Sequence, residues 1–428
     1  MTSRLFPRAL LCGLSLVISA CGDEPRSAEW AIPVSQDTPI IEHPAVSIDE
    51  REGQRVELVR DLVIGARGDD PDYLFFFEEG WKALAVDDEG RIYVGDGPNR
   101  RIQVFDPRGR YLRTLGRPGS GPGELEYPPF LITVAGERVL VGYSRRPRLD
   151  EWSSAGEFLN RRHFDDDRGF LQLSGTESGD FLAAYGLRVA DDSWRREVHI
   201  ARLADVASLE LQHMRQVDPP MAEAPSEQVS VARPLMKLGF YRPSFDVARS
   251  GELYLTGGSE YQVLAQGADG HSRWRMRVPW PRHRPTEAEQ AKFLEQFRQA
   301  GAAAANKEWF EARTRDDVGV VGPWPALSSI RVDGHGHIYV FPTVTELPGT
   351  YDELPVDVYS SDGERLFAGF LPVLSPPIDS LSLLLYLPLL SEQEAWLAAF
   401  EDYVYRIEED ERTGEGIVVR YRLVEPFD

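Results

Sequence analysis

The stretch LAVDDEGRIYVGDGPNRRIQVFD, residues 84–106, decides the fold, because it holds three short apolar runs separated by turns. The runs cover residues 84–86, 92–96 and 101–105. Clusters of Asp, Gly and Pro lie between them, which is typical of hairpin turns, so the runs predict antiparallel strands. A fourth run at 111–115 completes a four-stranded sheet that cannot bury both of its faces alone.

The same unit returns along the chain. Further units cover residues 130–161, 171–203 with a later strand, 244–278, 329–370 and 402–423. The pattern acid-x-x-Gly-x-apolar-Tyr-apolar at 87–94 recurs at 333–340, and at 248–255 with alanine in place of the acid. An all-strand unit repeated every 40–70 residues or so predicts blades around an axis. We therefore predict an all-β fold, a six-bladed β-propeller of four-stranded antiparallel blades, with five or seven blades as alternatives.

The ring must also close. Residues 56–65 form a lone apolar strand ahead of the first complete unit, and the last unit, near 403–423, is short of strands. A ring of blades leaves no sheet edge free only when its two ends pair with each other. We therefore expect the strand at 56–65 to join the last blade.

The first unit carries a family resemblance. Residues 92–106 and the glycine-rich stretch 116–124 closely resemble an NHL repeat. The chain after its leader is similar to bacterial six-bladed propeller lipoproteins built from such repeats. That resemblance implies a module that binds a protein, peptide, glycan or RNA. A minority of such propellers are similar in fold to lactonases or lyases that use a metal on the propeller axis.

One segment breaks the strand pattern. Thr286 and Glu289 have the spacing of a helix capping box, and apolar residues then recur at helical spacing. We expect one helical insertion at about 285–313, between the fourth and fifth blades. It is interpreted either as a lid over the axial channel or as a decoration on a blade edge.

The N-terminus indicates export. Residues 1–20 join a basic start, which contains Arg4 and Arg8, to a short apolar run, as in a lipoprotein signal peptide. Residues 18–21 resemble a lipobox, which implies cleavage before Cys21 and lipidation of its sulfur. An ordinary signal peptide is the alternative. We expect residues 21–54 to be the lipidated cysteine and a flexible tether, and residues 55–428 to be the propeller.

These features predict a protein of the cell envelope, anchored to a bacterial membrane through Cys21 and facing the periplasm or the cell exterior. The inner and the outer membrane are the alternatives for this anchor. The formal net charge of the chain is −22. A strongly acidic protein repels phosphate backbones, so nucleic acid is excluded as an expected partner.

Candidate binding residues follow the second strand of each blade, where loops face each other at one mouth of the channel. Tyrosine and arginine supply contact area and directed donors, and both are enriched at binding centres. The candidates are Asp96, Asn99, Arg100, Tyr143, Arg145, Tyr185, Arg188, Ser259 and Tyr261. The alternative for residues of the repeat itself, such as Asn99, is that they hold the blade together.

Motifs for chemistry are sparse. The glycines at 116–123 are followed by a strand where a phosphate loop needs a helix, so they are interpreted as a turn between blades. His335 and His337 lie in a turn, and no further metal ligands can be named from the sequence. We therefore predict no cofactor and no metal site. The predicted function is an anchored module that binds an unknown protein, peptide or glycan; the alternative is a metal-dependent, lactonase-like hydrolase or lyase.

Overall fold

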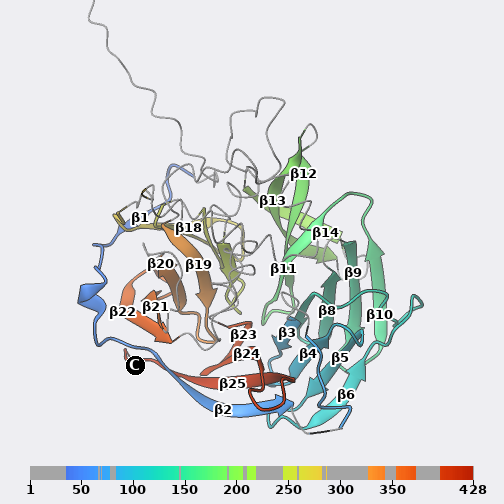
Figure 1. Cartoon of the computed structure of the whole chain (residues 1–428). Coiled ribbons are helices and arrows are strands. Elements are labelled where there is room, and N and C mark those ends of the chain that lie inside the picture. The colour runs from blue at the N-terminus through green and yellow to red at the C-terminus, as the bar shows by residue number, and fades with distance from the viewer. Residues whose placement is uncertain are drawn as a thin grey trace, which may run out of the picture.

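The computed structural model describes residues 35–65, 68, 70–77, 83–143, 146–189, 192–205, 210–217, 244–257, 260–281, 286, 326–342, 353–372 and 396–427. These residues form 25 strands and one short 3-10 turn, Asp49–Arg51. The strands make six antiparallel four-stranded units that follow one another around a ring (Figure 1). The predicted fold, an all-β six-bladed propeller, is therefore confirmed.

Each of the first five blades is a meander of four consecutive strands. The bounds are β3 (Ala83–Val86), β4 (Ile92–Asp96), β5 (Arg101–Phe105), β6 (Tyr111–Leu115); β7 (Leu131–Ala135), β8 (Arg138–Tyr143), β9 (Arg146–Ser153), β10 (Phe158–His163); β11 (Gly169–Gly175), β12 (Phe181–Val189), β13 (Asp192–Asp205), β14 (Glu210–Val217); β15 (Ser244–Val247), β16 (Leu253–Thr256), β17 (Gln262–Gln266), β18 (Ser272–Arg277); and β19 (Leu327–Val332), β20 (Ile338–Pro342), β21 (Glu353–Tyr359), β22 (Arg365–Pro372).

The sixth blade closes the ring. It contains β23 (Ala398–Phe400), β24 (Tyr403–Glu409) and β25 (Gly416–Val424) from the end of the chain. Its fourth strand is β2 (Glu57–Gly65), which pairs antiparallel with β25. Figure 1 shows this blue strand lying along the red C-terminal strand. The predicted pairing of residues 56–65 with the last blade is confirmed.

The repeated turn explains why each blade folds locally. In the first blade, Oδ1 of Asp87 accepts hydrogen bonds from the backbone N–H groups of Glu89 and Arg91, at 3.0 and 2.8 Å. Such side-chain bonds hold an aspartate turn. Gly90 has a φ of 72°, in the left-handed region that favours glycine. The Asp and Gly of the repeat are therefore the residues that make the hairpin.

The hydrophobic core is divided among the six junctions between blades. Each apolar cluster draws its buried residues from two successive blades, including the junction between the sixth blade and the first. At that last junction, Ile64 of β2 lies with Phe105 of the first blade and Tyr405 of the sixth. Each blade thus buries both of its faces only because it has two neighbours.

Part of the expected tether packs on the propeller. Within residues 21–54, the described stretch 35–54 contains β1 (Ile40–Glu42), which pairs parallel with β18 at the outer edge of the fourth blade. Arg51 is fully buried, and Ile41 packs against the cluster between the fourth and fifth blades. Residues 35–54 are therefore a strap and not a free tether, because a buried guanidinium and a strand pairing hold them in place.

Several predictions fall outside the described residues. These are the signal peptide at 1–20, the lipidated Cys21, and nearly all of the helical insertion at 285–313, of which only Thr286 is described. In the part of the chain that the structure describes, no helix is both long enough and apolar enough to cross a bilayer.

Candidate functional site

The first strands of all six blades surround an axial cavity. It has a volume of about 250 Å³ and is lined by residues of β3, β7, β11, β15, β19 and β23. All six blades therefore contribute residues to the wall of this cavity. Its wall is not uniformly apolar, because Gln172, Asp246, Arg249, Arg331 and Asp333 are among the residues that line it.

Asp246 connects three blades at the wall of this cavity. Its Oδ1 accepts hydrogen bonds from Nε2 of Gln172 at 3.1 Å and from the backbone N–H of Val247 at 2.9 Å. Its Oδ2 accepts one from the backbone N–H of Val332, at 2.9 Å. Burial raises the pKa of Asp246, and this outweighs the opposing effects of the positive charge of Arg331 and of the hydrogen bonds.

Charged side chains also meet at the end of the cavity where the first strands turn into the second strands. Arg249, from the turn after β15, forms an ion pair with Asp88, from the turn after β3. The guanidinium carbon of Arg249 lies 5.1 Å from the centre of the Phe400 ring, which belongs to the sixth blade. Arg249 therefore connects the turns of the first and fourth blades with the end of β23 in the sixth blade.

The candidate binding residues of the first blade, Asp96, Asn99 and Arg100, hold the loop between β4 and β5 in place. Asp96 is fully buried, and its Oδ2 accepts hydrogen bonds from Nδ2 of Asn99 at 2.9 Å and from Nε of Arg101 at 2.8 Å. Nη1 of Arg100 donates to the backbone oxygen of Glu126 at 3.3 Å. The structure thus brings Asp96 and Asn99 together, within the blade and away from the residues that line the axial cavity.

The tyrosine candidates are buried and lie apart from one another. The hydroxyl of Tyr143 donates to Oδ2 of Asp150 at 2.6 Å. The ring of Tyr185 stacks on His199, with 5.4 Å between the ring centres. The hydroxyl of Tyr261 donates to Asp357. None of the three lines the axial cavity.

The remaining candidates, Arg145, Ser259 and the side chain of Arg188, lie outside the described part of the structure. That any of the nine candidates contacts a ligand therefore stays a prediction. Those that are described use their polar atoms or aromatic rings within the protein, which agrees with the alternative that repeat residues hold the blades.

Sequence reasoning missed the residues of the cavity wall. It examined the ends of the second strands, whereas the wall is built from the first strands. A signal was available in β15, which reads SFDV, and in β19, which reads LSSIRV. In both, a charged residue precedes the last apolar residue of a short strand, and the two opposite charges, Asp246 and Arg331, lie on neighbouring blades.

No family model matches this chain, and no curated protein matches it. Among solved structures it is similar to a member of the DUF4221 family from Bacteroides vulgatus, at 13% identity and a TM-score of 0.49, over 86% of this chain and 99% of that one. It is also similar to a protein from Bacteroides fragilis named as exported, at 13% identity and a TM-score of 0.47, over 90% and 100%.

Proposed function

We propose that this protein is an exported, lipid-anchored binding module whose axial cavity takes a small polar ligand, of the size of a peptide or glycan fragment. The observation that carries the proposal is the wall of the cavity, where Asp246 and Arg331 lie half-buried on neighbouring blades. Removing charges from water without full compensation is costly. Charged and amide groups at the wall of an enclosed cavity are groups with which a polar ligand can pair.

The chemistry of the wall defines the class of ligand. A carboxylate, a guanidinium and the amide of Gln172 offer acceptors and donors within one enclosure. Binding pockets generally place a few polar groups of this kind in a concave site to orient the ligand. A ligand with several hydroxyl, amide or charged groups matches this wall better than an apolar one does.

The anchor rests on the sequence alone. The basic start, the apolar run and the small residues before Cys21 support export and lipidation. Several acyl chains on one cysteine would hold the domain at a membrane surface, because each buried methylene contributes about 0.8 kcal/mol. The acidic net charge of −22 agrees with a partner other than nucleic acid.

Thermal-shift and calorimetric titration with free amino acids, dipeptides, monosaccharides and disaccharides tests the proposal. The protein used is the mature chain with Cys21→Ser, which is not lipidated. We expect at least one of these probes to raise the melting temperature. Arg331→Met removes a charge from the cavity wall and is expected to weaken binding of that probe about tenfold or more, as for a lost charge-assisted hydrogen bond.

Arg117→Met is the matched control, because Arg117 is exposed, pairs with Glu124 and lies outside the cavity. It should bind the probe as tightly as the parent protein does. If no probe binds, or if Arg331→Met binds as well as Arg117→Met, the axial cavity is not the binding site.

A further inference from the structure

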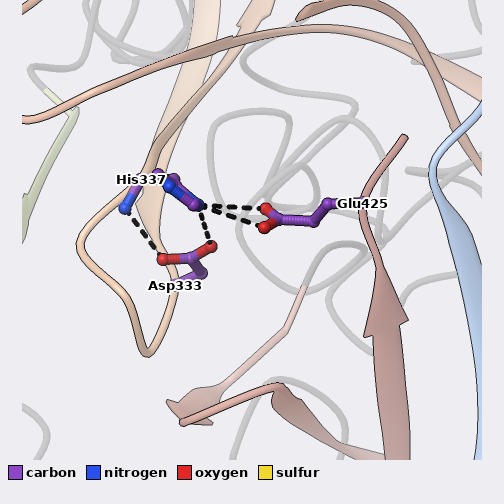
Figure 2. A group of neighbouring side chains, drawn as sticks. All are labelled: Asp333, His337 and Glu425. Atoms are coloured by element: carbon purple, nitrogen blue, oxygen red, sulfur yellow. Dashed lines mark hydrogen bonds and ion pairs between the residues drawn. The ribbon is translucent and has the colours of Figure 1, made fainter. Parts of the chain in front are cut away.

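Two carboxylates and an imidazole converge beside the cavity. Asp333 directly follows β19, the first strand of the fifth blade, His337 precedes β20, and Glu425 follows β25 in the sixth blade. Figure 2 shows both carboxylates pointing at the same imidazole nitrogen. Nδ1 of His337 lies 3.0 Å from Oδ2 of Asp333 and 3.1 Å from Oε2 of Glu425. The sequence did not reveal this group, because Glu425 is far from the histidine along the chain.

The equivalent turn of the first blade shows what is special here. There, Nε of Arg91 pairs with Oδ2 of Asp87 at 2.6 Å, and the hydroxyl of Tyr93 donates to the same carboxylate. His337 takes the position of that arginine relative to Asp333, whose Oδ1 accepts the backbone N–H of His337 at 2.8 Å. An arginine cannot lose its proton and cannot ligate a metal, whereas a histidine can do both.

The group is also built for a cation. The side chains of Asp333 and Glu425 are 1% and 4% exposed, so two carboxylates are buried side by side. Like charges in such a place need a compensating positive charge. The two carboxylates raise the pKa of His337 to about 10, so a protonated imidazole fills that role when no metal is bound.

We propose that Asp333, His337 and Glu425 form a binding site for one divalent transition-metal ion of the zinc type. The three ligand atoms lie within 4.8 Å of one another. Tetrahedral zinc bonds of about 2.0–2.2 Å require the imidazole nitrogen to lie only a few tenths of an ångström further from each carboxylate oxygen than the 3.0 and 3.1 Å found here. The metal takes the place of the proton on Nδ1, and that proton leaves to solvent.

Other features of the group suit this ion. Imidazole nitrogen favours zinc over calcium and magnesium, which prefer oxygen ligands alone. Tyr339 donates a hydrogen bond to Glu425, and backbone N–H groups donate to Asp333. These hydrogen bonds fix the orientation of both carboxylates, as the outer partners of metal ligands commonly do. The side chain of His337 is 22% exposed, which leaves an approach for the ion and a position for water.

A metal at this place would fasten the ring. Asp333 and His337 belong to the fifth blade, while Glu425 follows directly on β25, the strand that pairs with β2 to close the propeller. The ion would therefore connect the closing blade to its neighbour. Asp333 also lines the cavity, but the site uses none of Asp246, Gln172 and Arg331, so zinc binding is tested separately from the proposed binding function.

Calorimetric titration with zinc chloride, after dialysis against a chelator, tests the site in the mature chain with Cys21→Ser. We expect one zinc ion per chain and a rise in melting temperature on binding. His337→Arg introduces the residue type that the first blade has at this position, Arg91. It keeps a positive charge between the carboxylates but removes the imidazole nitrogen that would bind the metal. It is expected to fold and to bind zinc at least 100-fold more weakly.

His335→Ala is the matched control, since His335 bonds to Asp402 at 2.7 Å and lies outside the group of three. It should bind zinc as the parent protein does. Glu425→Gln is a second variant, expected to lose at least tenfold in affinity, and it decides the matter if His337→Arg fails to fold. The site is wrong if the parent protein binds no zinc at micromolar concentrations, or if loss of the ligand leaves the affinity unchanged.

Discussion

A chain that begins at residue 66 is expected to lose cooperative folding, although it keeps all of the strands of the first five blades. It lacks β2, which pairs with β25 through the eight residue pairs from Glu57↔Val424 to Gly65↔Ile417. Without β2 the last blade has three strands and an open edge. Ile64, which is 1% exposed, is also removed from the junction of the sixth and first blades.

The size of this effect follows from the fold. Burial of one large aliphatic side chain contributes about 1.5–3 kcal/mol, and the pairing of a whole strand adds its hydrogen bonds. A domain is typically stable by only about 5–15 kcal/mol. Loss of β2 therefore removes a free energy comparable to the total stability of the domain.

A chain that begins at residue 55 provides the control, because it lacks β1 and Arg51 but keeps β2. It should melt cooperatively, at a lower temperature than a chain that begins at residue 35. Circular dichroism during heating distinguishes the three chains. Equal melting temperatures for the chains that begin at 55 and 66 would show that β2 does not close the ring.

Arg51→Met is expected to destabilise the protein by about 3–5 kcal/mol, as when one partner of a buried ion pair is removed. Nη1 of Arg51 lies 2.7 Å from Oδ1 of Asp357, and the two side chains are 0% and 1% exposed. Nη1 also donates to the backbone oxygen of Val356 at 2.9 Å. The substitution leaves the carboxylate of Asp357 buried without its cation, which is the source of the cost.

The double variant Arg51→Met with Asp357→Asn tests that cause. An asparagine carries no charge but keeps an oxygen that accepts the hydrogen bond from Tyr261. The double variant should therefore be more stable than Arg51→Met alone, by about half of the loss or more. Urea unfolding of the parent protein, Arg51→Met, Asp357→Asn and the double variant gives the coupling free energy between the two residues. If the losses of unfolding free energy in the two single variants add up to the loss in the double variant, the two charges do not stabilise each other.

Local patterns in the sequence were sufficient for the fold. The turn at 87–91 forms because Asp87 accepts hydrogen bonds from backbone N–H groups within five residues of itself. The sequence of a single blade is therefore enough to predict this turn. The pairing of β2 with β25 was also predictable, because a ring that starts with a lone strand and ends one strand short has only one way to leave no free edge.

The site could not be predicted in the same way. Gln172, Asp246 and Arg331 come from three successive blades and become neighbours only when those blades pack against one another. Glu425 and His337 likewise meet through the junction between blades, which no local pattern encodes. Arg51 lies in a stretch without hydrophobic periodicity, so the sequence favoured a tether where the structure has a buried ion pair.

A disulfide between β2 and β25 measures ring closure most directly. Val59 and Arg422 are directly opposite each other and exposed, and opposed residues of antiparallel strands are about 4.5–5.5 Å apart between Cα atoms, within the range of a disulfide. In the mature chain with Cys21→Ser, Val59→Cys with Arg422→Cys should oxidise fully within one chain and raise the melting temperature. Two free thiols in the folded, oxidised protein would contradict the closed propeller on which the cavity and both proposed sites depend.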